Sequence, residues 1–72
     1  MSDKQRYESL AEMEASEEFP KIRQLLEDMA GEPMMWRGQA AAELPLRFRE
    51  AGISKGISLE AAKNLVDNYY PD

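Results

Sequence analysis

A glycine and a proline two residues apart, Gly31 and Pro33, place the firmest limit on how this chain can fold. Apolar residues recur at helical spacing up to Met29, and Ser16 is a suitable cap for the start of that helix. Glycine favours the left-handed C-cap that ends a helix, and proline then prevents its continuation because it has no N–H to donate. We therefore predict a helix over residues 16–30 that stops at Gly31.

Three further helical segments follow from the same kind of signal. Ser2 can cap a helix over residues 2–16, and Ser58 can cap a last helix that Pro71 ends. The buried face predicted for this last helix consists of Leu59, Ala62, Leu65, Val66 and Tyr69.

Between these segments, residues 33–51 have helical spacing but contain Pro45. An internal proline removes a hydrogen bond and collides with the preceding turn, so we expect either a sharp kink or two helices, 33–43 and 45–51. β-branched residues are scarce and no polar–apolar alternation is long enough for a strand. The predicted fold is all-α, a compact bundle of four to five short helices forming one domain over residues 1–72, with residues 1–5 and 71–72 frayed.

The absence of cysteine and histidine excludes several kinds of chemistry. Disulfides and thiolate metal sites are impossible, and the commonest metal ligand and general base is missing. The sequence also lacks the spaced acids and glycine of a calcium loop. We expect no cofactor, no metal, no small-molecule substrate and no enzymatic activity, and association with a protein or a second copy remains the available means of added stability.

Acidic residues are concentrated in the first half of the chain. The whole chain has a net charge of −5, and residues 1–32 hold nine acidic and four basic side chains. Such a half repels phosphate backbones, which makes nucleic-acid binding unlikely, and the plainest role of the charge is to keep a small domain soluble. An alternative is an inhibitor that mimics nucleic acid, similar in its charge pattern to small acidic phage-encoded proteins; its acidic surface would consist of Glu8, Glu12, Glu14, Glu17 and Glu18.

A second alternative rests on basic residues near a short glycine-flanked connector. Two helices joined by such a connector are also how many DNA-binding proteins are built. The candidate phosphate contacts of a helix-turn-helix are Arg47, Arg49, Lys55 and Lys63.

The stretch from Gly31 to Pro45 combines methionines, the only tryptophan and a run of alanines. Methionine adapts to partner surfaces, and tryptophan and arginine are enriched among interface hot spots. We expect Trp36 at or near the core, because a small domain has few large apolar side chains, and Met34 as the exposed apolar residue. The candidate protein-binding residues are Met34, Trp36, Arg37, Leu44 and Phe48.

These observations predict a small acidic, non-enzymatic protein-binding module, a regulator or inhibitor that acts through a helical surface. Its partner would be another protein or a second copy of the same chain. The longest apolar run is far below the roughly 20 residues that a membrane span needs, and the first residues lack a secretory apolar segment. We therefore expect a cytoplasmic protein without a membrane partner.

Overall fold

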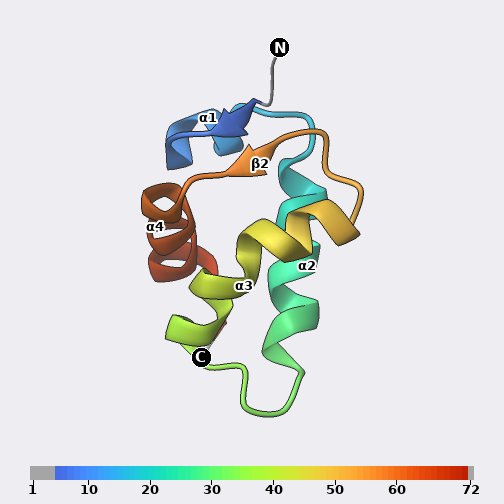
Figure 1. The fold of residues 1–72 in the computed structure, drawn as a ribbon, viewed down its shortest axis with the longest axis vertical. Coiled ribbons are helices and arrows are strands. Elements are labelled where there is room, and N and C mark those ends of the chain that lie inside the picture. The colour runs from blue at the N-terminus through green and yellow to red at the C-terminus, as the bar shows by residue number, and fades with distance from the viewer. Residues whose placement is uncertain (1–4, 72) are drawn as a thin grey trace.

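The computed structural model describes residues 5–71, and within this range the chain forms four helices and two short strands (Figure 1). The protein is mostly helical, as predicted, but the predicted bundle did not include the two-stranded sheet. The sheet and the first helix lie together at one end, and the other three helices extend below them. The elements in chain order are β1 (Arg6–Tyr7), α1 (Leu10–Glu14), α2 (Phe19–Ala30), α3 (Arg37–Glu50), β2 (Gly56–Ile57) and α4 (Leu59–Tyr69).

The N-terminal segment differs most from the sequence prediction. We expected a helix over residues 2–16; instead, β1 pairs in parallel with β2, and the helix begins only at Leu10. Its cap is Ser9, whose Oγ accepts a hydrogen bond from the N–H of Glu12 at 3.2 Å. The extended backbone of β1 buries the Tyr7 ring. The predicted helix has a thin apolar stripe and would bury less of this ring. The predicted Ser2 cap and the fraying predicted for residues 1–4 and 72 lie outside the described residues.

Helix α2 confirms the predicted stop but not its mechanism. Pro20 lies in the first turn, and Gly31 is the C-cap. Gly31 is right-handed, with φ of −82°, because the N–H groups of Gly31 and Glu32 donate to carbonyls three residues earlier and so close the helix with a tight turn. The left-handed residue is Met34, with φ of 62°.

Pro45 does not split the third helix into separate elements. Helix α3 runs without interruption from Arg37 to Glu50, and it starts four residues later than Pro33. Pro45 lies on the exposed side of α3, so its ring does not disturb the core side of the helix. Gly52 ends this region in the left-handed conformation, with φ of 75°.

The core lies between α3 and the elements on either side of it (Figure 1). Ala40, Ala61 and Ala62 are fully buried, so α3 and α4 approach closely. The Tyr7 ring meets Phe48 edge to face, with centroids 6.4 Å apart, and so joins β1 to the same core. The predicted Ser58 cap is confirmed, since Ser58 Oγ accepts the N–H of Ala61 at 3.1 Å.

The carboxylate of Glu18 connects three segments that are distant in the sequence. The hydroxyl of Tyr7 donates to Glu18 Oε1 at 2.9 Å. The N–H of Ser54 donates to Glu18 Oε2 at 2.8 Å, and the Ser54 hydroxyl donates to Oε1 at 2.9 Å. These contacts join β1, the start of α2 and the connection that leads into β2, and we call them the Glu18 junction.

Replacing the Glu18 carboxylate should destabilise the fold. Glu18→Ala removes the acceptor of three hydrogen bonds, and hydrogen bonds to charged groups typically contribute about 1.5–3 kcal/mol when protected from water. Because Glu18 is half-buried, we expect a loss of about 1–2 kcal/mol in the free energy of unfolding, measured by urea denaturation. The matched control is Glu17→Ala, an exposed neighbour outside the junction. Equal stability of both variants would contradict this role.

The same junction predicts a pH dependence of stability. Hydrogen bonds, first from the Ser54 N–H and then from Tyr7, hold the pKa of Glu18 below its usual 4.5, so the charged form stabilises the folded state. That contribution is complete above the unfolded-state pKa and is lost as the pH falls through the lower folded-state pKa. Thermal melts from pH 6 to pH 3 should therefore show a smaller acid-induced loss of stability for Glu18→Gln than for the wild type. If the stability of both proteins decreases equally as the pH falls, Glu18 does not contribute to the pH dependence.

Candidate interaction surface

Large apolar side chains on the surface gather around α3 and the start of α4. The exposed fractions are 82% for Met34, 66% for Trp36, 57% for Leu59 and 51% for Leu46. The predicted exposure of Met34 is confirmed, whereas the predictions that Trp36 lies in the core and that Leu59 is buried are wrong. Helix α4 buries Ala61 in its first turn, and Leu59 remains at the surface.

Two of the predicted protein-binding residues belong to the core. Leu44 and Phe48 are fully buried. They follow Ala40 at intervals of four, so all three lie on the inner stripe of α3, and they cannot contact a partner while the domain is folded. The predicted set therefore divides into a core pair and a surface group that consists of Met34, Trp36 and Arg37.

Trp36 is held at the start of α3 by contact with that helix's first turn. It is the N-cap residue, with extended backbone, so its side chain does not continue the helical array. A Cβ atom on Gly38 would lie 3.5 Å from the indole Nε1 and 3.7 Å from Cδ1. The indole therefore lies beside Gly38, at a distance where a methyl group would make an ordinary contact.

A shallow depression separates α3 from α4 beside this tryptophan, and we call it the α3–α4 groove. Its volume is about 320 Å³. Small and apolar side chains of both helices form its walls, and charged side chains stand at its rim. The lining residues are Arg37, Gly38, Ala41, Ala42, Leu59, Lys63, Val66 and Asp67.

One face of α3 runs from the groove toward the C-terminal end of the helix. Gly38, Ala42, Pro45 and Arg49 follow each other at intervals of three or four, all are exposed, and we call them the α3 face. Only Arg49, at the C-terminal end, is charged. An uncharged helix face flanked by exposed Trp36 and Leu46 is typical of a surface that contacts a partner.

Most carboxylates of the predicted acidic surface have partners within the chain. Glu8 pairs with Arg6 at 2.8 Å, and Glu12 accepts the N–H of Glu8 at 2.6 Å. Glu14 accepts a hydrogen bond from the Tyr69 hydroxyl, which raises the pKa of that tyrosine, and Glu18 forms the junction described above. Glu17 is exposed at the end of this series.

The basic residues predicted for a helix-turn-helix do not form one surface. Arg47 donates to both oxygens of Glu32, at 2.7 and 2.6 Å, and to Glu43 at 3.1 Å. These carboxylates raise the pKa of Arg47 further above its usual value, and Arg47 in turn lowers that of Glu32.

Arg49 and Lys55 line a different cleft from Lys63. The connection between α3 and α4 also contains a strand paired with β1, in place of the three- or four-residue turn of that motif.

The chain was compared with family models, characterised proteins and solved structures. The chain matches no family model, no characterised protein and no solved structure at a significant level. Within residues 5–71, no group of three acidic side chains could hold a metal ion, and no helix is long and apolar enough to cross a membrane.

The contrast between Trp36 and Phe48 gives a direct test of this placement. Trp36→Ser removes an exposed side chain and should change the free energy of unfolding by no more than about 0.5 kcal/mol. Phe48→Ala removes a fully buried ring and should cost about 3–5 kcal/mol. Urea denaturation followed by circular dichroism measures both. A large loss for Trp36→Ser would show that the indole is part of the core.

Proposed function

We propose that this chain is a protein-binding module whose contact surface is the α3–α4 groove with the exposed Trp36 at its edge. The observation that supports this most is the position of the indole. It lies against Gly38, is two-thirds exposed and stands beside a groove with small apolar walls. A small domain gains more by burying its only tryptophan, so its exposure indicates that a partner covers it.

Energetics favour this surface over the rest of the molecule. Each Å² of apolar area removed from water contributes about 25 cal/mol, and tryptophan presents the largest apolar side chain. Leu59, on the opposite wall of the groove, adds to the area that a partner can cover. Arg37 and Lys63 at the rim can form hydrogen bonds with a partner's polar groups, which would orient the complex.

The partner that best suits the groove is an amphipathic helix. Groove walls contributed by two neighbouring helices accept apolar side chains spaced at i, i+3, i+4 and i+7 on a third helix. Such a helix could belong to another protein or to a second copy of this chain. We favour a helix of another protein. Measurement of the oligomeric state distinguishes it from a helix of a second copy.

The two alternative functions receive less support. In the acidic series, at least four of the five carboxylates bind groups of this chain, and their positions follow from its own folding. Among the basic residues, Arg47 is neutralised by two carboxylates. Neither series offers a specific feature comparable to the exposed tryptophan.

The proposal predicts that surface changes abolish binding without unfolding the domain. The test protein is Trp36→Ser with Leu59→Ser, and the control is Glu17→Ser with Lys21→Ser on α2 and its preceding loop. We expect wild type and control to retain the same proteins from a lysate of the native host, and the groove variant to lose them, since hot-spot residues each contribute at least about 2 kcal/mol. Mass spectrometry identifies the retained proteins.

Tryptophan fluorescence and sedimentation complete the experiment. Addition of the purified partner should shift the Trp36 emission to shorter wavelength, because the indole leaves water. Sedimentation equilibrium of the wild type alone should show a monomer. If the groove variant keeps the partner with unchanged affinity, the groove is not the binding surface; a dimer that dissociates in the groove variant would identify a second copy as the occupant.

A further inference from the structure

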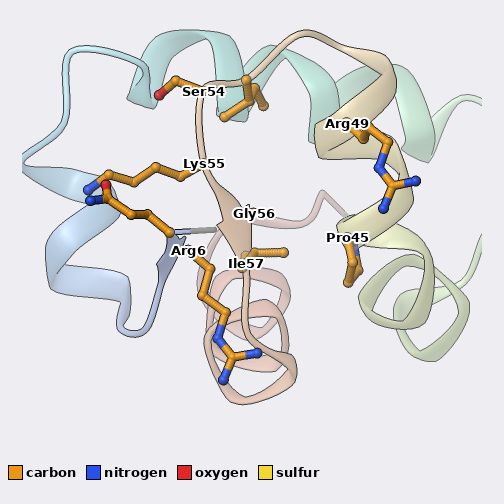
Figure 2. Close-up of a pocket in the computed structure, with 9 residues that line it drawn as sticks. Arg6, Pro45, Arg49, Ser54, Lys55, Gly56 and Ile57 are labelled. Atoms are coloured by element: carbon orange, nitrogen blue, oxygen red, sulfur yellow. The ribbon is translucent and has the colours of Figure 1, made fainter. Parts of the chain in front are cut away.

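A second cleft lies at the other end of α3, where that helix faces the two-stranded sheet (Figure 2). Its volume is about 530 Å³. Arg49 and Pro45 stand on the α3 side of β2, whereas Arg6 and Lys55 stand on the other side. We call it the sheet cleft; its lining residues are Gln5, Arg6, Pro45, Arg49, Ile53, Ser54, Lys55, Gly56 and Ile57.

The charge of the sheet cleft is opposite to that of the protein. Three cationic side chains from β1, α3 and the connection before β2 line it, and none of the lining residues is acidic. Arg6 contacts Glu8, and Lys55 lies 5.0 Å from the centre of the Tyr7 ring. In the part of the chain that the structure describes, neither Arg49 nor Lys55 forms an ion pair, although acidic residues outnumber basic ones. Lys55 also lines a neighbouring depression with Glu12, Glu17 and Glu18, whereas Arg49 does not. Arg49 is therefore the cation of the sheet cleft that most favours an anionic ligand.

Gly56 leaves the floor of the sheet cleft without a side chain. Its φ is not in the left-handed region, so its backbone conformation does not require glycine. A Cβ atom would lie 3.6 Å from Arg6 Cβ and 3.9 Å from the Gln5 carbonyl oxygen, which are ordinary contacts, so packing does not require glycine either. Glycine weakens a strand, and its presence there often marks close approach of a ligand or another backbone.

We propose that the sheet cleft binds an acidic, extended segment of a protein partner. The segment's backbone would cross Gly56, and its carboxylates would bind Arg49 and Lys55. An apolar side chain of the segment would pack on the wall that Pro45, Ile53 and Ile57 form. This site does not depend on the α3–α4 groove, because the two share no lining residue.

A protein segment fits these observations better than a nucleic acid. A protein that binds duplex DNA commonly makes about 6–10 phosphate contacts, whereas this cleft supplies three cations. The net charge of −5 would repel a long polyanion, and a short segment with a few carboxylates meets less repulsion. An apolar peptide side chain can pack on the apolar wall, whereas a phosphate backbone offers no apolar group for this contact.

The test uses a fluorescein-labelled octapeptide of alternating glutamate and valine, titrated with the full-length protein and followed by fluorescence anisotropy. We expect saturable binding that weakens as salt is added, since it depends on charge. Arg49→Glu should weaken binding at least about tenfold, because it replaces an attraction by a repulsion. Gly56→Val should weaken it similarly by filling the floor of the cleft.

The matched control is Arg23→Glu, which makes the same charge change at an exposed residue of α2 that lines neither cleft. It should leave peptide affinity within about twofold of the wild type, allowing for long-range screening. Because Arg49 is exposed, its variant reports on binding even if Gly56→Val fails to fold. Three results would overturn the proposal: absence of peptide binding, equal losses for Arg49→Glu and Arg23→Glu, or tighter binding of single-stranded DNA than of the peptide.

Discussion

The arrangement of the sheet cleft depends on the hydrogen bonds that the Glu18 carboxylate accepts. Through Ser54 this carboxylate fixes the connection that leads into β2, and through Tyr7 it fixes β1 beside that strand. A sheet with two residues in each strand has few backbone hydrogen bonds of its own, so these side-chain bonds stabilise the pairing. Since the sheet forms one wall of the sheet cleft, the position of its cations follows from the junction.

Local signals in the sequence were sufficient for the helices but not for this end of the molecule. The Ser58 cap and the stop at Gly31 follow from residue types within a few positions of each other. The pairing of Arg6 with Gly56 joins residues 50 positions apart, and each strand is too short to show alternation. No window of the sequence contains that information, which is why a helix was predicted over residues 2–16.

The candidate surface was predicted in part, for a similar reason. Residue types indicated that Met34, Trp36 and Arg37 could contact a partner, but a helical wheel for α3 depends on where that helix starts. If Pro33 were the first helical residue, Trp36 would lie on the core face of the helix. Because the helix begins at Arg37, Trp36 is the N-cap residue and does not belong to a helix face. The late start also exposes Gly38, whose contact with the indole could not be inferred from spacing.

Helix α3 connects the two proposed sites as a rigid element. Gly38 in the α3–α4 groove and Arg49 in the sheet cleft lie on the same face of the helix, about 16 Å apart at the usual rise per residue. Pro45, between them, leaves the helix continuous and presents a side chain that needs no polar partner. One partner with an apolar helix followed by an acidic segment could therefore contact both sites, and because the sites share no residue, their affinities would combine through effective concentration.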